Sequence, residues 1–134
     1  MVEIIWGEKM VEIIYVGSLD NVSDEIHNKM FAHAHGFAAG IAENGGKYGS
    51  KIFVDVGAFT TTPWPQKQVR MATYDAANKM LYLMGANELI EGLSFPEMSK
   101  ESMFDLQGSL NARGEYASFG LLDDLLTAHL QQSV

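Results

Sequence analysis

The sequence predicts a single α/β domain with a small, mostly parallel or mixed sheet of three to four strands, packed helices and a C-terminal helical segment. Three observations support this. Runs rich in β-branched residues alternate with runs of helical periodicity, which is the order of a strand-helix-strand unit. The chain has 134 residues, of which 47% are hydrophobic, enough for one core. Residues 1–134 contain no low-complexity segment or interdomain linker, so we expect one domain.

The chain opens on a repeat, because MVEII occurs at residues 1–5 and again at residues 10–14. The second copy continues into "VEIIYVG", residues 11–17, and these β-branched and aromatic residues predict a buried strand. The first copy can pair with it as an antiparallel edge strand, or residues 1–9 are an N-terminal extension. A two-residue turn would place Glu3 opposite Glu12, so a turn of three or four residues is expected.

A helix is predicted to begin near Ser23 and to end at Gly45-Gly46. Either Ser23 or Asn21 can cap its first amides. Its apolar stripe has spacings of three and four and consists of Ile26, Met30, Ala34, Phe37 and Ile41. A strip of small residues on the other side, Ala32, Gly36, Ala39 and Gly40, permits close approach of a second partner.

The middle of the chain predicts a strand followed by a second helix. In "KIFVDVGAF", residues 51–59, Ile52, Val54 and Val56 share one face, and Phe53 and Asp55 take the other. The helix is expected from about Pro65 to Met84, where Gly85 stops it. Its stripe is formed by Val69, Ala72, Ala76, Met80 and Leu83.

Residues 88–95, "ELIEGLSF", fit either a third strand or a short helical turn that ends before Pro96. The remainder predicts one or two helices interrupted by Gly108, Gly114 and Gly120. Its last part carries the most apolar stripe of the chain: Leu122, Leu125, Leu126 and Leu130. We expect this C-terminal segment to be used in dimerisation or a higher assembly.

Two connections follow predicted strands, at the sheet edge where ligands gather in open parallel sheets. The first, "GSLDN", offers Ser18, Asp20 and Asn21. The second, "DVGAFTTTPWP", offers Asp55, the hydroxyls of Thr60, Thr61 and Thr62, and the flat ring of Trp64. If the two strands are adjacent and parallel, these side chains form a polar pocket with an aromatic wall.

In this hypothesis Asp55 is the catalytic base or hydrogen-bond acceptor, and the remaining side chains bind the ligand. The threonines and the amides of the following helix would hold an anionic group. Each residue also has a structural interpretation, because Thr62 can cap a helix, Asp55 can bond within a turn and Trp64 can pack at an interface.

The histidines of "HNKMFAHAHG" give a second hypothesis, a metal site. At about 100° per residue, His33 and His35 point to nearly opposite sides of a helix, whereas His27 and His35 lie within roughly 80° of each other. His27 and His35 are therefore the candidate ligands, and a third would have to come from elsewhere. The alternative is that these histidines border a helix interface and are hydrogen-bonded there.

The charge of the chain excludes one class of partner. Nine Lys and Arg against seventeen Asp and Glu give a formal net charge of -8, which repels phosphate backbones, so nucleic acid is not expected as a partner. No window approaches the roughly 20 apolar residues of a membrane span, and no export signal is recognised, so we expect a cytoplasmic protein that does not bind membranes. Only 19% of the residues are charged, which favours a homo-oligomer.

The first functional hypothesis is therefore a domain that binds, or an enzyme that acts on, a small polar metabolite, either neutral or anionic, at the C-terminal ends of the strands. The alternative is a non-catalytic homo-oligomeric module for protein interaction or assembly. A metal-binding protein using the helix histidines is the second alternative. The sequence names no cofactor and no reaction, and it leaves open whether the protein is an enzyme.

Overall fold

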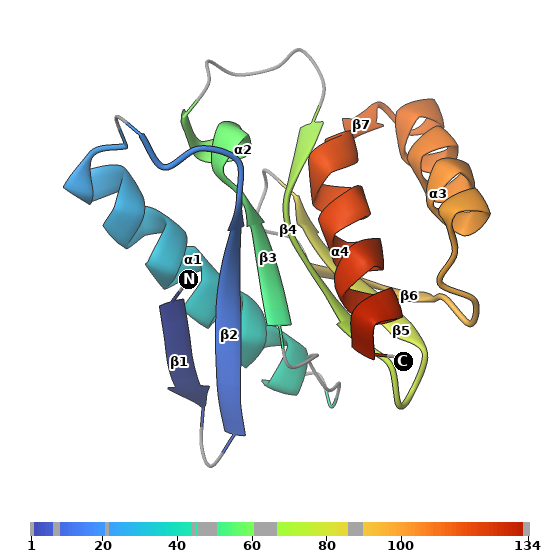
Figure 1. Ribbon diagram of the computed structural model, residues 1–134, viewed down its shortest axis with the longest axis horizontal. Helices are drawn as coiled ribbons and strands as arrows, with labels where there is room; N and C mark the ends of the chain where they lie inside the picture. Colours follow the sequence, from blue (N-terminus) through green and yellow to red (C-terminus); the bar gives the residue numbers. More distant parts are fainter. Residues whose placement is uncertain are drawn as a thin grey trace.

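A computed structural model of the chain describes residues 2–6, 9–20, 22–43, 45, 51–60, 67–85 and 90–132. The protein is a single small α/β domain (Figure 1). The elements are, in order, β1 (Val2–Trp6), β2 (Lys9–Val16), α1 (Asp24–Glu43), β3 (Lys51–Asp55), α2 (Val56–Thr60), β4 (Lys67–Asp75), β5 (Met80–Gly85), β6 (Ile90–Ser94), α3 (Lys100–Ala112), β7 (Glu115–Tyr116) and α4 (Phe119–Gln132).

The sheet is mixed and larger than the three to four strands expected from the sequence. Its strands follow chain order from β1 to β6, and β7 lies beside β4. β2 and β3 are parallel because α1 connects them, whereas β1–β2, β3–β4, β4–β5 and β5–β6 pair antiparallel. The short β7 pairs parallel with the start of β4. The α/β class is thus as predicted, and antiparallel pairing dominates the sheet.

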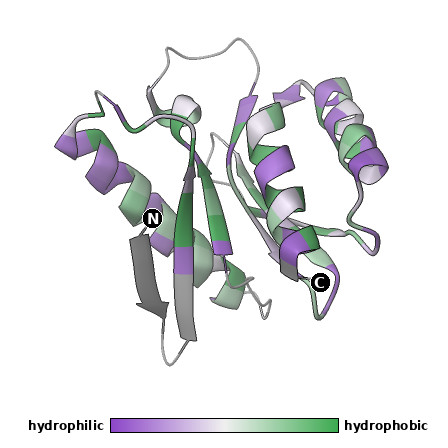
Figure 2. Ribbon diagram, in the orientation of Figure 1, coloured by the Kyte–Doolittle hydropathy of each residue, from purple (hydrophilic) through white to green (hydrophobic). Residues whose placement is uncertain are grey.

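Helices cover both faces of this sheet, so the strands have two buried sides. On one face α1 and α2 pack over a cluster that includes Ile13, Ile52 and Met71. On the other face α3 and α4 pack over a cluster that includes Phe53, Ala72 and Leu81. We call these the α1 face and the α4 face. Hydrophobic residues accordingly concentrate in the strands, and the helices alternate between hydrophobic and hydrophilic residues (Figure 2).

The alternation predicted for β3 is confirmed. Ile52, Val54 and Val56 belong to the cluster under α1, and Phe53 belongs to the cluster under α4. The strand is shorter than expected, since residues 56–60 form the single turn of α2 instead of continuing β3. The Asp55 carboxylate accepts a hydrogen bond from the Gly57 amide at 3.1 Å, and this contact starts the helical turn directly after the strand.

The predicted helix after Ser23 is also confirmed. The Ser23 hydroxyl accepts a hydrogen bond from the Ile26 amide at 3.2 Å and caps α1. Met30, Ala34, Phe37 and Ile41 of the predicted stripe are buried, together with Ala38. Gly40, from the strip of small residues, lies so close to Ile90 of β6 that a Cβ atom there would overlap Ile90 Cδ1. Gly40 therefore faces β6, whereas Ala32 and Gly36 of the strip are exposed, and α1 reaches across to the far edge of the sheet.

The prediction of a helix from about Pro65 to Met84 is wrong, because β4 and β5 form a hairpin there. The spacing of Val69, Ala72, Ala76, Met80 and Leu83 matched a helical period by coincidence. The residues of the turn between β4 and β5 favour the hairpin over a helix. Asp75 Oδ1 accepts hydrogen bonds from the amides of Ala77 at 3.1 Å and Asn78 at 3.3 Å. Lys79 adopts φ 54°, a left-handed conformation that ends the turn.

The two ambiguous regions are resolved as a strand and two helices. Residues 90–94 form β6, which pairs with β5. The C-terminal region divides at Gly114, whose φ of 77° stops a helix, whereas Gly108 and Gly120 lie within α3 and α4. Ser99 and Ser102 form a reciprocal capping box at the start of α3. None of the helices in the described ranges has the length and hydropathy of a membrane span.

The register of β1 against β2 differs from the expected one. Trp6 pairs with Lys9 and Glu3 lies opposite Glu12, the arrangement that a longer turn was expected to avoid. Like charges at directly opposed positions destabilise a sheet, so the pairing that the sequence disfavours is the one observed.

The two glycines of α1 should respond differently to alanine. A Cβ at Gly36 meets no atom within 4 Å, so Gly36→Ala should raise the free energy of unfolding by about 0.5–1 kcal/mol, the usual gain within a helix. Gly40→Ala should gain less or lose stability, because Ile90 must move. Urea denaturation of both variants measures the difference. Equal gains would show that α1 does not depend on the close approach to β6.

Candidate functional site

The carboxyl ends of β2 and β3 lie side by side, as the predicted pocket requires. The strands are adjacent and parallel, with Val16 opposite Asp55. Asp55 is 5% exposed and Gln68 of β4 is 7% exposed. Gln68 Nε2 donates to Asp55 Oδ2 at 3.4 Å, and Asp55 Oδ1 accepts from the Gly57 amide. The Ser118 hydroxyl and the Ala58 amide also donate to this carboxylate.

Burial raises the pKa of Asp55 above its ordinary value, and the hydrogen bonds from Ser118, Ala58, Gly57 and Gln68 each lower it in part. Ser118 itself caps α4, because its Oγ accepts from the Leu121 amide at 3.1 Å. The carboxylate thus joins the end of β3, the start of α2, β4 and the start of α4. This geometry gives Asp55 a structural function, and its role as a catalytic base stays a prediction.

Of the other residues in the predicted pocket, Ser18, Asp20 and Thr60 are described by the structure and four are not. Ser18 and Asp20 lie in an exposed turn after β2, where the Asp20 amide donates to Ser18 Oγ at 3.1 Å. Thr60 ends α2, and its hydroxyl donates to the Val56 carbonyl at 3.1 Å. Asn21, Thr61, Thr62 and Trp64 lie outside the described residues. Their assignment to a ligand site stays a prediction.

Each α1 histidine lies against an aromatic ring. His27 packs on Tyr15 with ring centroids 5.3 Å apart, and His35 packs on Phe31 at 6.2 Å. His33 meets Phe59 of α2 edge to face at 5.4 Å. Among the described residues no group of three or more His, Cys, Asp or Glu side chains is arranged to hold a metal ion. The metal site with His27 and His35 therefore stays a prediction.

A hollow on the α1 face was not expected from the sequence. It has a volume of about 360 Å³ and lies between α1 and the neighbouring strands β5 and β6. Its lining consists of Ala32, His33, Gly36, Met84 and Ile90. Most of this surface is apolar, and His33 is its polar member. His33 also contacts Phe59, which lies at the end of the sheet where α2 follows β3.

Arg70 reaches the same Phe59 ring from β4. Its guanidinium carbon lies 5.0 Å from the ring centroid, a cation–π contact. Arg70 is the extra residue of a bulge, because Val69 and Met71 pair with the consecutive residues Gly85 and Met84. Within the described part of the chain, Arg70 Nε is buried and has no hydrogen-bond partner. Arg70 does not line the hollow, but it contacts the same Phe59 ring as His33, which does. A guanidinium group with an unsatisfied donor is a potential anion contact.

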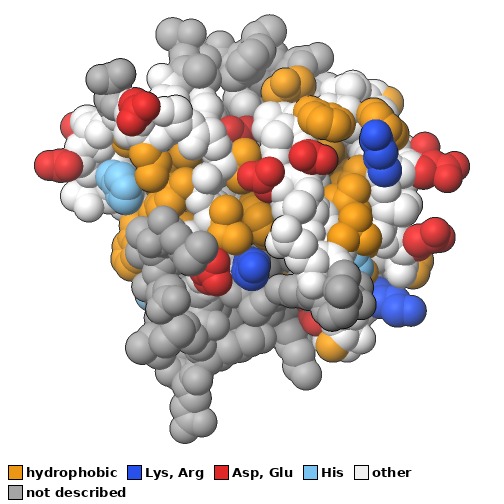
Figure 3. Space-filling view, viewed as in Figure 1, with side chains coloured by type: hydrophobic (Ala, Val, Ile, Leu, Met, Phe, Trp, Pro, Cys, Tyr) orange, Lys and Arg blue, Asp and Glu red, His pale blue; other side chains and the backbone are white. Residues whose placement is uncertain are grey.

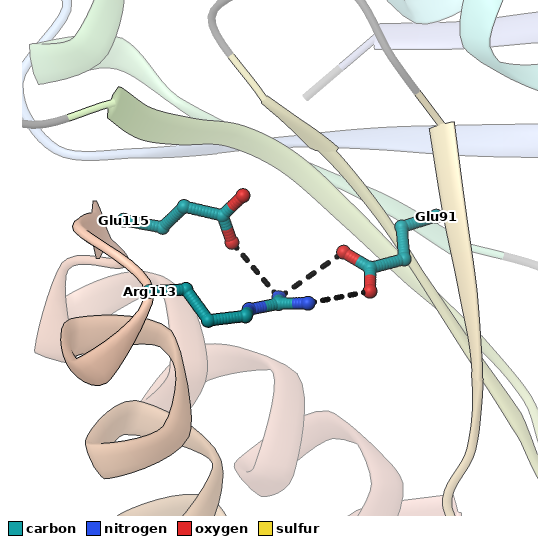
Figure 4. A network of polar contacts seen from close by, with 3 residues as sticks. All are labelled: Glu91, Arg113 and Glu115. Atoms are coloured by element: carbon teal, nitrogen blue, oxygen red, sulfur yellow. Dashed lines mark hydrogen bonds and ion pairs between the residues drawn. The ribbon is translucent and has the colours of Figure 1, made fainter.

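The other arginine of the chain, Arg113, has hydrogen-bond partners for its guanidinium group. Arg113, at the end of α3, donates to both oxygens of Glu91 at 2.8 and 3.1 Å, and to Glu115 at 2.8 Å (Figure 4). These contacts, Glu91 first, raise the pKa of Arg113. The three residues join β6, α3 and β7 on the surface. Their exposure makes the network a modest contribution to stability.

Sequence reasoning missed Arg70 because it assigned the residue to a helix. A usable signal was present in the printed sequence. The segment "DAANKM" combines Asp75 and Asn78, which favour turns. It separates a run that contains Val, Thr and Tyr from a second run with Tyr82 between two leucines. That pattern predicts a hairpin, and a hairpin would have placed Arg70 in a strand beside the predicted strand of residues 51–59.

Comparison of the chain with protein-family models, curated proteins and solved structures gives no significant match. The function is therefore inferred from the geometry of the site.

The buried Asp55 carboxylate gives a pH dependence that can be measured. Its pKa is raised in the folded state, so its ionisation disfavours folding. Stability from this group is therefore greatest below its unfolded pKa of about 3.9 and falls as the pH rises through the folded value. In urea denaturation, the wild type should lose stability relative to Asp55→Asn as the pH increases across that window. A difference that stays constant or changes in the opposite direction contradicts the assignment.

Proposed function

We propose that this protein binds a small organic anion with an apolar body, in the hollow between α1 and strands β5 and β6. The volume of about 360 Å³ falls in the range of roughly 300–1,000 Å³ that is typical of small-molecule sites. Ala32, Gly36, Met84 and Ile90 offer an apolar surface to the body of the ligand. The anionic group would be directed toward the Phe59 ring, which both His33 and Arg70 contact.

The proposal rests on one observation, the buried Nε of Arg70 that has no hydrogen-bond partner among the described residues. A guanidinium group has donors in a fixed fork that matches a carboxylate or a phosphate. Arg113 uses this fork on Glu91. Arg70 has a buried Nε without a partner among the described residues, and the bulge in β4 directs the side chain toward Phe59. The cost of an unsatisfied buried donor, about 1–3 kcal/mol, would be recovered when an anion accepts from it.

Because the chain has a net charge of -8, the guanidinium group of Arg70 is more important for attracting an anion at short range. The field of an acidic protein repels anions at a distance, so long-range steering does not help the ligand to arrive. Recognition must come from contacts inside the site, where short-range hydrogen bonds and burial of apolar surface act together. We therefore expect ligands that combine one negative group with a hydrophobic part, and we expect inorganic phosphate alone to bind poorly.

The proposed ligand keeps the anionic group considered in the first functional hypothesis and adds an apolar body, and the proposed site lies elsewhere. Both sites lie at the end of the sheet where α2 follows β3. The hypothesis from the sequence used Asp55 and the connections after β2 and β3. Asp55 points to the α4 face, where Gln68 and Ser118 engage it. Arg70 and His33 lie on the α1 face, so the proposed ligand contacts come from α1, α2 and the β4–β5 hairpin.

A thermal-shift screen tests the proposal with matched pairs of ligands. Benzoate and hexanoate should raise the melting temperature, whereas the neutral amides of the same acids should have little effect. A ligand present at about 100 times its Kd adds about 2.7 kcal/mol to the free energy of unfolding. Phenyl phosphate and inorganic phosphate extend the panel to the other anion class.

Arg70→Gln should weaken binding of the active anion by about 10- to 100-fold, the effect of losing a charged hydrogen-bond donor. Arg113→Gln is the matched control, because it removes the other arginine, which lies on the α4 face, and its affinity should equal that of the wild type. Titration calorimetry provides both values. Wild-type affinity in Arg70→Gln, or equal shifts with acids and amides, would overturn the proposal.

A further inference from the structure

A second hollow lies on the opposite side of the molecule, between α3 and α4. It is lined by Met103, Phe104 and Gln107 from α3, by Phe119, Leu122 and Leu126 from α4, and by the charged residues Lys100 and Asp123. Figure 3 shows a run of hydrophobic side chains crossing the surface where α3 and α4 lie. We call this surface the α3–α4 groove.

Large hydrophobic side chains of the groove remain open to solvent. Phe104 is 51% exposed and Phe119 is 53% exposed, and their ring centroids lie 6.2 Å apart. At about 100° per residue, Leu130 lies on the same side of α4 as Phe119, Asp123 and Leu126, and it is 51% exposed. Leu130 therefore adds an exposed apolar side chain on the same side of α4, beyond the hollow. Exposed apolar side chains gathered on one side of a helix pair make this surface a candidate for contact with another molecule.

The charges of the groove favour a second copy of the same chain as that molecule. The groove contains one cation, Lys100, on α3 and one anion, Asp123, on α4, so its local charge is balanced while the whole chain carries -8. A surface with one charge of each sign on opposite walls is complementary to itself under a two-fold rotation.

We propose that the α3–α4 groove is the interface of a homodimer with two-fold symmetry. Phe104 and Phe119 form its apolar centre, and Lys100 faces Asp123 of the partner subunit on each side of the axis. The low share of charged residues, 19%, is consistent with a domain that covers part of its apolar surface in this way. The ligand site proposed above lies on the α1 face, so dimerisation would leave it open.

Gel filtration with light scattering tests the interface across a wide range of protein concentration. The wild type should be a dimer, and Phe119→Glu should be a monomer because it places a carboxylate in the apolar centre. Phe31→Glu is the control, since Phe31 is an aromatic residue of α1 that is 37% exposed and lies outside the groove. Circular dichroism confirms that each variant is folded. A wild-type monomer at every concentration, or a dimer in Phe119→Glu, would overturn the proposal.

Charge exchange between copies provides a test that does not depend on an apolar substitution. Lys100→Glu and Asp123→Lys should each weaken the dimer, because each places like charges across the axis. A mixture of the two variants should form a heterodimer, since the two substituted positions then carry opposite charges across the axis and the wild-type pair forms on the other side. A mixture that is as monomeric as its components contradicts the interface. This result would leave the anion site untouched, because its test measures ligand binding by the α1 face.

Discussion

The buried carboxylate of Asp55 is the contact on which the arrangement of the other elements depends. It ends β3, starts α2 through the Gly57 and Ala58 amides, and binds Gln68 of β4 and Ser118 at the start of α4. A charge at 5% exposure is tolerated only where donors satisfy it. Those donors come from the start of α2, from β4 and from the residue that caps α4, so one side chain connects the point where α2 leaves the strand with the start of α4. Its burial keeps the pKa raised despite these donors.

The two faces of the sheet are covered differently. On the α4 face, α3 and α4 cover the cluster around Phe53 and Leu81, and their outer sides retain the exposed stripe of the groove. On the α1 face one long helix extends from β3 to β6, where Gly40 permits contact with Ile90. A single long helix cannot fill the space over so wide a sheet, and the remaining volume is the hollow beside His33 and Met84. The hollow is thus a consequence of covering this side with one long helix and the single turn of α2.

The sequence correctly predicts those elements whose secondary structure is determined by their own residues. Ser23 and the stripe from Met30 to Ile41 define α1 without reference to any neighbour, and Ile52, Phe53 and Val54 alternate as a strand buried on both faces. The hairpin of β4 and β5 could not be recognised from its hydrophobic spacing, because each strand is buried on both faces and its apolar residues then fit more than one period. The Asp75 and Asn78 turn was the decisive local signal.

The candidate site was less predictable because its members are distant in the sequence and meet only through topology. His33, Phe59 and Arg70 come from three elements, and no local pattern relates them. A bulge adds one residue at Arg70, and this extra residue is visible only in the pairing of β4 with β5. Phe59 contacts a guanidinium group from β4 and a histidine ring from α1. In a chain with a net charge of -8, this local cation is the feature on which the proposal of an anion site rests, in place of the polar connections after β2 and β3.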